Sequence, residues 1–322
     1  MADTWTISKL LSSLQGYLQG RGIENPRLDA EVLISHVLKC DRIRLYTHFD
    51  QPVTEDERTT LRELARRRGQ GEPVAYLTGV REFFSRDFAV NQSVLIPRPE
   101  TEHVVECALA WYRHAQPRAP RICDVGTGSG AIGITLACEI PDAQVVLTDL
   151  SPEALAVAEG NAQKLGVGDR VTCVQANLLT PQESAGAAAE ALEKNFDIIV
   201  SNPPYIAEGD LAGLPRDVAH FEPHLALKAG AEGLDCLLAL CAAVPKSLAA
   251  SAFLAVEMGE GQGDAVRQAM AAILPHVAGV EDLAGIERVV AGWHDATFNL
   301  SAPSPFMGVA LPTVSPRLEP GA

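Results

Sequence analysis

Short β-prone runs alternate with helical stretches from residue 121 onward, and this alternation constrains the fold more than any other feature of the sequence. The runs are Arg121 to Val125, Gln144 to Thr148, Arg170 to Gln175, Asp197 to Ser201 and Phe253 to Glu257. Parallel neighbouring strands need crossover connections, and these are usually helices. The pattern predicts an α/β domain with a parallel, doubly wound sheet, whose ligand site lies at the carboxyl ends of its strands.

The region before this domain has a helical period instead. Leucines at positions 10, 11, 14 and 18 mark the apolar face of a first helix. A second helix is expected to open at Asn25-Pro26, and a third, over about residues 54–68, begins with a capping-box match at Thr54. We expect a small helical domain over residues 1–80, which serves substrate recognition in the interpretation given below.

The remaining segments are assigned from their turn and proline content. Two β-prone runs on either side of Asn91-Gln92-Ser93 predict a β-hairpin linker over residues 81–100. The α/β domain then covers residues 101–296, and its segment 181–193, rich in Ala and Glu, is expected to form a surface helix or loop. Prolines from Pro303 to Pro320 predict a disordered tail over residues 297–322.

Charge and composition exclude several classes of protein. The net charge of −15 disfavours nucleic-acid binding, and direct DNA binding is not expected. No run is long and apolar enough for a membrane span, and the N-terminus lacks the features of a signal peptide, so a cytoplasmic protein is expected. A monomer is also expected. The seven cysteines contain no C-x-x-C, which predicts reduced, buried thiols without a disulfide framework or a metal site.

A glycine-rich loop follows the first β-prone run of the α/β domain. It reads Asp124-Val-Gly126-Thr-Gly128-Ser-Gly130 and precedes a helical stretch. Glycines suit a sharp turn in which a ligand approaches the backbone closely. Gly128 to Gly133 also matches the dinucleotide fingerprint G-x-G-x-x-G, with Asp149 about 20 residues further on. The loop therefore predicts a nucleoside cofactor and leaves its identity open between a nicotinamide dinucleotide and another nucleoside.

Asp149 closes the second β-prone run and allows two interpretations. A carboxylate at that strand end can accept hydrogen bonds from both hydroxyls of a ribose. Ser151 and Pro152 open a helix immediately afterwards, so Asp149 can instead support the start of that helix electrostatically. We favour the ribose role, because strand, loop and acid occur together at the expected intervals.

The motif Asn202-Pro203-Pro204-Tyr205 follows the run Asp197 to Ser201 and indicates the chemistry. The nitrogen of an amide or aromatic amine is a poor nucleophile, because its lone pair is delocalised. The Asn202 side-chain carbonyl and the Pro203 main-chain carbonyl can each accept one N–H proton and so aim the lone pair at a methyl donor. The prolines fix φ and offer no competing N–H, and Tyr205 offers a flat face for stacking. A rigid Pro-Pro turn without chemistry is the alternative interpretation.

With these motifs in hand, the chain from about residue 5 to residue 293 resembles the bacterial release-factor glutamine methyltransferases, the HemK/PrmC family. The segments that carry the resemblance are Pro73 to Gly79, Leu95 to Glu102, Asp124 to Gly130, Ser201 to Ile206, Phe221 to Leu227 and Glu287 to Val290. The resemblance implies a Rossmann-like class I methyltransferase fold. It also implies S-adenosylmethionine-dependent methylation, with S-adenosylhomocysteine as product, of the side-chain amide nitrogen (N5) of the glutamine in the Gly-Gly-Gln motif of class I peptide-chain release factors.

The resemblance also assigns roles by matching position. The expected cofactor-binding residues are Gly126, Thr127, Gly128, Ser129, Gly130, Asp149, Asn177, Leu178 and Asn202, and the expected catalytic and substrate-binding residues are Asn202, Pro203, Pro204 and Tyr205. Many relatives carry an acidic residue where this chain has Asn177, whose carbonyl can still accept a hydrogen bond from the adenine amine. The N-terminal helices are implied to hold the release factor.

Two charged segments keep two interpretations each. Arg98 and Glu100 lie before a helix, where charged residues are usually solvated, although the resemblance puts their segment beside the cofactor site. Residues 66–68, three arginines, form either a solvated helix face or a contact with the partner or ribosomal RNA.

Three other functions remain as alternatives to glutamine methylation. A DNA or RNA exocyclic-amine methyltransferase can use the same Asn202 motif, because the exocyclic amine of a base is also planar and conjugated. Such an enzyme is expected to carry a basic groove. A nicotinamide dehydrogenase leaves the Asn202 motif unexplained. A noncatalytic binding module of the same fold would bind the cofactor and transfer nothing.

Overall fold

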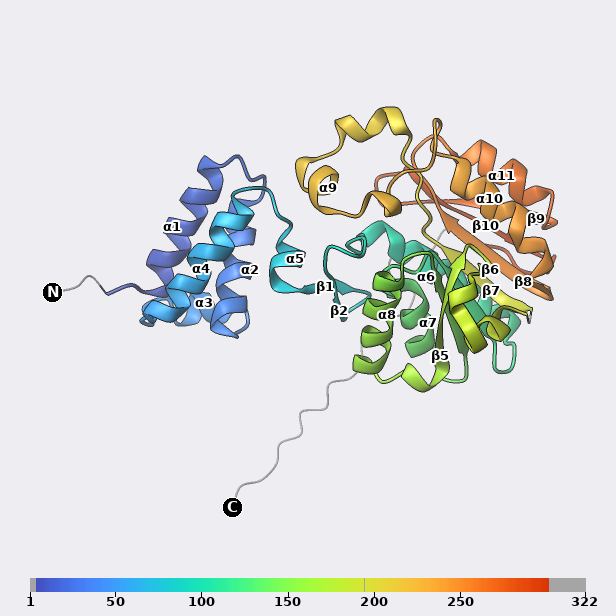
Figure 1. Cartoon of the computed structure of the whole chain (residues 1–322), viewed down its shortest axis with the longest axis horizontal. Helices are drawn as coiled ribbons and strands as arrows, with labels where there is room; N and C mark the ends of the chain where they lie inside the picture. The colour runs from blue at the N-terminus through green and yellow to red at the C-terminus, as the bar shows by residue number, and fades with distance from the viewer. Residues whose placement is uncertain (1–3, 194, 301–322) are drawn as a thin grey trace, which may run out of the picture.

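The computed structural model describes residues 4–193 and 195–300. The part of the chain from β3 onward forms a domain around an eight-stranded sheet (Figure 1). In spatial order the strands are β6 (Thr180–Pro181), β5 (Val171–Asn177), β4 (Gln144–Asp149), β3 (Arg121–Val125), β7 (Phe196–Ser201), β8 (Leu248–Glu257), β10 (Glu287–Trp293) and β9 (His276–Glu281). The five neighbouring strands β5, β4, β3, β7 and β8 run parallel, and each overlaps one of the β-prone runs. The predicted α/β class is confirmed.

The sheet is not parallel throughout, and that part of the prediction is wrong. Strand β10 is antiparallel to both β8 and β9, and β6 is antiparallel to β5. A short turn joins β9 to β10, in which the Asp282 carboxylate accepts from the backbone N–H groups of Ala284 and Ile286. A connection of this length can join only antiparallel neighbours. The sheet is therefore mixed, with its antiparallel pairs at the two edges.

Helices cover both faces of the sheet, as a doubly wound fold requires. On one face lie α6 (Glu102–Ala115), α7 (Ala131–Glu139) and α8 (Pro152–Lys164), and on the other lie α10 (Asp235–Ala243) and α11 (Gly263–Ala271). Successive strand residues point to opposite faces, so Ile122 and Val145 join the first apolar cluster while Cys123 and Val146 join the second. Burial on both sides explains the nearly continuous apolar character of these strands.

Five helices precede the β-hairpin and have an apolar core of their own. They are α1 (Ile7–Gly20), α2 (Pro26–Leu38), α3 (Arg44–Thr47), α4 (Glu55–Arg68) and α5 (Val74–Thr78), and Figure 1 shows them at the opposite end of the molecule from the sheet. The predicted apolar face of α1 is buried, and Pro26 opens α2. Thr54 and Glu57 form the expected capping box at the start of α4.

The hairpin linker is present, but its turn lies elsewhere. Strands β1 (Val80–Phe83) and β2 (Arg86–Ala89) meet at Phe84 and Ser85, whose φ angles are 50° and 57°. Two positive φ values in a two-residue loop match the type I′ turn, which usually contains Asn or Gly, and neither residue signals it in the sequence. The prediction that Asn91-Gln92-Ser93 is the hairpin turn is wrong, because this segment follows β2 and forms a separate turn, in which the Asn91 carbonyl accepts from the Val94 N–H at 3.2 Å.

The surface connections are short helical turns. The segment 181–193, expected to be a surface helix or loop, contains η3 (Glu183–Leu192). The other short elements are η1 (Pro99–Thr101), η2 (Gly168–Arg170), η4 (Glu208–Gly213), α9 (Arg216–Phe221), η5 (His224–Ala226) and η6 (Val244–Lys246). None of the helices in residues 4–193 and 195–300 has the length and apolarity of a membrane span.

The end of the chain departs from the predicted tail. Phe298 and Leu300 are buried in the same apolar cluster as α6, so the expectation of disorder is wrong for residues 297–300. Phe298 packs edge-on against Trp293 and Phe253, which fixes this segment beside the sheet. The remainder of the predicted tail, residues 301–322, lies outside the described residues.

The three arginines at the end of α4 serve different purposes. Arg68 pairs with Asp29 of α2 at 2.6 Å, and both side chains are largely buried. Arg67 pairs with the buried Glu72 at 2.5 Å, whereas Arg66 is exposed and pairs with the exposed Glu63. The interpretation as a solvated helix face therefore fits Arg66 and is wrong for Arg68, which holds helices of the N-terminal bundle together.

Asn161 connects the hairpin to the sheet domain. It lies on α8 and is fully buried. Its side-chain oxygen accepts from the Ala89 N–H at 2.7 Å, and its nitrogen donates to the carbonyls of Ala89 at 3.0 Å and Ser129 at 2.8 Å. One amide thus satisfies backbone groups of both β2 and the glycine loop, which fixes the loop against the linker.

Asn161→Ala is expected to lower the free energy of unfolding by about 2 kcal/mol, because it leaves three backbone groups without their partner in a buried place. Urea unfolding measures the change. Glu159→Ala, an exposed change on the same helix, is the matched control and is expected to stay within about 0.5 kcal/mol of the parent protein. Equal stability of the two variants would contradict the linking role of Asn161.

Candidate active site

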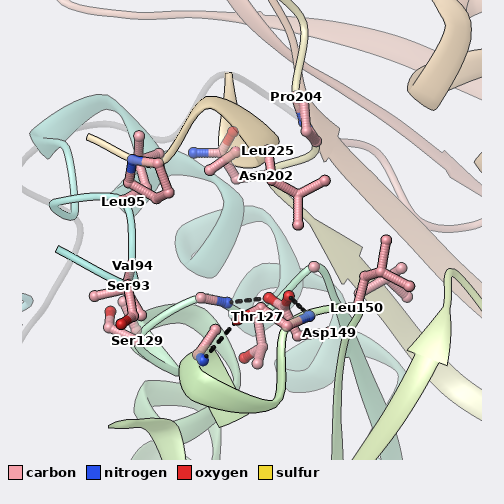
Figure 2. A pocket seen from close by; sticks show the side chains of 18 of the residues that line it. Ser93, Val94, Leu95, Thr127, Ser129, Asp149, Leu150, Asn202, Pro204 and Leu225 are labelled. Carbon is pink, nitrogen blue, oxygen red and sulfur yellow. Dashed lines mark hydrogen bonds between the residues drawn. The ribbon is translucent and has the colours of Figure 1, made fainter. Parts of the chain in front are cut away.

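A cavity of about 370 Å³ lies at the carboxyl ends of the parallel strands, where the fold predicts a ligand site (Figure 2). This volume is in the range of small-molecule sites. Its walls come from the glycine loop after β3, the ends of β4 and β5, the loop after β7, the segment after the hairpin, and η5. The lining residues used below are Thr101, Gly126, Gly128, Asp149, Asn177, Leu178, Asn202, Pro204, Pro223 and Leu225.

The register of the strands brings three of the predicted residues together. Val125 of β3 pairs with Thr148 of β4 on one side and with Ser201 of β7 on the other. Gly126 and Asn202 directly follow the last residues of β3 and β7, and Asp149 is the last residue of β4, so all three lie at the same edge of the sheet. Residues far apart in the sequence therefore face one cavity.

The glycine loop is open toward the cavity. Gly126, Gly128 and Gly130 have φ angles of 70°, 55° and 83°, a region that side chains disfavour. A Cβ atom at Gly126 or Gly128 would meet no atom within 4 Å, whereas at Gly130 it would strike Ile134 of α7. The first two glycines therefore expose backbone to a ligand, and the third allows helix and loop to pack closely.

Asp124 supports this loop from below. Its side chain is fully buried, and one oxygen accepts from the Thr127 hydroxyl at 2.7 Å and from the Gly133 N–H at 2.9 Å. Burial raises the pKa of Asp124 to about 6, and these two hydrogen bonds oppose the rise. The predicted binding set omitted Asp124, although an acid directly before the glycines was the signal that pointed to it.

Asp149 holds the loop and the start of α8 at once. Its carboxylate oxygens accept from the N–H groups of Gly128 and Ser151, both at 2.9 Å. Ser151 in turn caps α8 by accepting from Ala154. Burial raises the pKa of Asp149, and the backbone hydrogen bonds oppose it. Each carboxylate oxygen keeps acceptor capacity for a ligand hydroxyl, so the helix-support and ribose interpretations are compatible.

The Asn-Pro-Pro-Tyr motif divides into two parts. Asn202 and Pro204 line the cavity, whereas Pro203 and Tyr205 are not among its lining residues. The Asn202 side-chain nitrogen donates to the Thr101 hydroxyl at 3.0 Å. Figure 2 shows Asn202 above Asp149 across the cavity. Asn177 and Leu178, expected on the adenine side, lie at the end of β5 and line the same cavity.

Tyr205 points away from the cavity and into a buried polar contact. Its hydroxyl donates to Glu257 at the end of β8, with 3.1 Å between the oxygens. Burial raises the pKa of Tyr205 well above its ordinary value and raises the pKa of Glu257 to about 7. The phenol therefore stays neutral. Sequence reasoning missed Glu257, since only the pairing of β7 with β8 brings it behind the motif.

Arg98 is not simply a solvated charge before a helix, because it forms an ion pair that helps to shape the cavity. It pairs with the buried carboxylate of Glu222 at 2.5 Å, across 124 positions of sequence. The neighbours Pro97 and Pro223 both line the cavity. The ion pair thus joins the segment after the hairpin to the segment after α9, and together they form one side of the cavity mouth.

Two family models match the chain. The model described as the PrmC N-terminal domain matches residues 9–79, and the model described as the methyltransferase small domain matches residues 112–214. The first falls on the helical bundle, and the second contains the glycine loop, Asp149 and Asn202. No cluster of three or more potential metal ligands occurs in the described part of the chain.

Curated relatives match over nearly their whole length. The release factor glutamine methyltransferase of Geobacter sulfurreducens is 41% identical, over 90% of this chain and 97% of the relative. The protein of the same name from Bordetella pertussis is 44% identical, over 83% of this chain and 95% of the relative. Among solved structures, the hMettl16 catalytic domain in complex with MAT2A 3′UTR hairpin 6 is 14% identical, with a TM-score of 0.51 over 78% of this chain and 87% of that chain. That likeness concerns the fold alone.

Arg98→Met is expected to lower the free energy of unfolding by about 2 kcal/mol at pH 8, because it leaves the buried Glu222 carboxylate without its partner. Burial already raises the pKa of Glu222, and Arg98 opposes that rise. In the variant the folded state binds a proton at a higher pH than the unfolded chain does, so stability falls as pH rises. Urea unfolding at pH 5 and pH 8 measures this.

The double variant Arg98→Met, Glu222→Gln is the control, and it is expected to recover part of the loss at pH 8 and to show less pH dependence. A loss of equal size at both pH values would contradict the role of the buried charge.

Proposed function

This chain belongs to the release factor glutamine methyltransferase family, and on that premise we propose that it methylates the side-chain amide nitrogen (N5) of the glutamine in the Gly-Gly-Gln motif of class I peptide-chain release factors. The methyl donor is S-adenosylmethionine, and S-adenosylhomocysteine is the product. The observation that carries the proposal is that the Asn202 amide lines the same cavity as Gly126 and Asp149. An acceptor for amide protons thereby lies next to a nucleoside-binding edge.

The residues of the cavity fit this cofactor. Gly126 to Gly130 offer backbone in a cradle that a Cβ atom would narrow, which suits the methionine portion. The Asp149 carboxylate suits the ribose hydroxyls, because each of its oxygens uses only one hydrogen bond within the protein. Asn177 and Leu178 suit the adenine. When bound, the cofactor supplies an electrophilic methyl group on a sulfonium.

The chain itself orients the substrate amide. Asn202 donates through its nitrogen to Thr101, which leaves its carbonyl oxygen as the acceptor for one amide proton of the substrate glutamine. The Pro203 main-chain carbonyl is proposed as the acceptor for the other. Holding both protons turns the nitrogen lone pair toward the methyl donor, and this orientation supplies the rate enhancement.

The N-terminal helices, proposed as a domain of residues 1–80, are assigned the role of holding the release factor. They match the PrmC N-terminal model over residues 9–79 and have an apolar core of their own. The hydrogen bonds of Asn161 fix the hairpin that follows these helices to the glycine loop. We assign the activity to the cytoplasm, because release factors act there in translation termination.

The decisive experiment incubates the protein with isotope-labelled S-adenosylmethionine and an unmodified class I release factor, followed by mass spectrometry of the Gly-Gly-Gln peptide. One added methyl group on the glutamine is expected. A release factor whose motif glutamine is replaced by alanine is the matched control and should take up no label. Label in nucleic acid, with none in the release factor, would instead support the exocyclic-amine alternative.

Asn202→Ala is expected to lower kcat by about a hundredfold or more, because it removes one preorganised acceptor of the substrate amide. Binding of S-adenosylhomocysteine, measured by calorimetry, should stay within about threefold of the parent protein, since the glycine loop and Asp149 are untouched. An unchanged kcat with intact product binding would remove Asn202 from the mechanism.

Asp149→Ala is expected to weaken S-adenosylhomocysteine binding by at least about tenfold, because it removes a half-buried carboxylate that accepts from the ribose hydroxyls. Asp169→Ala is the matched control, since Asp169 is an exposed carboxylate in η2, beyond the opposite end of β5. Calorimetry compares the two. Equal affinities would show that Asp149 supports only the start of α8.

A further inference from the structure

Helix α5 connects the N-terminal bundle to the wall of the cavity. Its Leu77 is buried in the apolar core of the bundle. The preceding residue, Tyr76, is buried in a different cluster, which includes Val94 and Ala154 of α8. Val94 and Ala154 both line the cavity. Two successive residues of one short helix therefore pack against the bundle core and against the cavity wall.

One part of this wall has no regular secondary structure. Ser93, Val94 and Leu95 follow the hairpin, belong to no helix or strand, and line the cavity. Figure 2 shows them on one side of the cavity and Leu150 on the other. A segment outside the sheet has no ladder of backbone hydrogen bonds to fix it. Its position therefore depends on contacts with neighbouring elements.

The Tyr76 hydroxyl supplies such a contact. It donates to the Val94 main-chain carbonyl at 2.6 Å, across 18 positions of sequence, and both residues are buried. Burial raises the pKa of Tyr76 well above its ordinary value, so the phenol keeps the proton that it donates. On the other side of the same residue, the Val94 N–H donates to the Asn91 carbonyl at 3.2 Å. Val94 is thus held at both of its backbone polar groups.

We propose that Tyr76 is a positioning residue for cofactor binding, whose hydroxyl holds the segment 93–95 in place as a wall of the cavity. The inference rests on the proposed function, in which this cavity binds S-adenosylmethionine. Among the described residues, none from α1 to α5 lines the cavity. Tyr76 therefore acts on the cofactor through the position of another segment. The domain assigned to the release factor thereby also helps to form the cofactor site.

The argument follows from the cost of an unpaired carbonyl in a buried place. Without the Tyr76 hydroxyl, the Val94 carbonyl is stabilised by moving toward water or another donor. The segment 93–95 moves with it, so the cavity lacks this wall for part of the time. The apparent affinity of a ligand falls with the fraction of molecules that are competent to bind it. Once the ligand is bound the wall is in place, and the rate of methyl transfer changes little.

Tyr76→Phe keeps the buried ring and removes only the hydroxyl. It is expected to raise the dissociation constant of S-adenosylhomocysteine, measured by calorimetry, by about fivefold, which corresponds to a wall that is in place in about one fifth of the molecules. With saturating release factor, the KM for S-adenosylmethionine should rise by a similar factor, while kcat stays within about twofold of the parent value. An unchanged dissociation constant, or a loss confined to kcat, would overturn the proposal.

Two control variants separate this role from a general loss of stability. Leu77→Val changes the neighbouring residue of α5, which packs into the bundle core, and lowers the free energy of unfolding without removing the contact to Val94. Tyr17→Phe removes the hydroxyl of an exposed tyrosine of α1. Both should bind S-adenosylhomocysteine within about twofold of the parent protein. A loss of affinity in Leu77→Val as large as that in Tyr76→Phe would contradict a specific role of the hydroxyl.

Hydrogen exchange in the absence of any ligand tests the wall directly. The N–H groups of Ser93 and Val94 donate to the Asn91 side chain and carbonyl, at 2.8 Å and 3.2 Å, and they exchange when the segment opens. In Tyr76→Phe they should exchange at least about fivefold faster relative to the amides of β3. Equal relative rates in the two proteins would overturn the proposal. If exchange and affinity change as expected but the release factor takes up no methyl group, only the proposed function fails.

Discussion

The site depends on the common register of three parallel strands. Val125 of β3 lies between Thr148 and Ser201, so the chain leaves β4, β3 and β7 at one level of the sheet. The glycine turn, the Asp149 carboxylate and the Asn202 amide each come directly after one of these three aligned residues, so they face one cavity. A one-residue slip would exchange the residues of each strand between the two closely packed apolar clusters, so packing on both faces protects the geometry of the site.

The acids near the cavity are partly desolvated and held by donors in place of water. Asp124 and Asp149 each accept from backbone N–H groups of the glycine loop or its neighbours, and Glu257 accepts from a phenol. Burial raises the pKa of all three, and the hydrogen bonds restrain the rise. Their dipoles and charges are therefore fixed before a ligand arrives, which is the arrangement that favours catalysis by preorganisation.

Features that depend on a short stretch of sequence could be predicted from the sequence alone. Five strands, the glycine loop and the capping box at Thr54 follow from short patterns, and the structure contains them. The hairpin turn at Phe84 and Ser85 contains no glycine or asparagine from which it could be predicted. The burial of Phe298 depends on its aromatic partners and not on the proline-rich sequence around it. Thr101, Glu257 and Asn161 meet their partners across 101, 52 and 72 positions, and no pattern in one sequence reports such distances.

Tyr205 stabilises the conformation of the residues that precede it in the motif. The expected stacking face is not part of the cavity wall, and the residue is held at two places instead. Its hydroxyl donates to Glu257, and its main-chain carbonyl accepts from the Gln262 side chain at 3.0 Å. A Cβ atom at Gly259 would come within 3.3 Å of the Tyr205 ring, so that segment packs closely against it. Because Tyr205 is fixed from behind, the two prolines before it have little freedom, and the carbonyls of Asn202 and Pro203 keep their orientation without being reordered at each turnover.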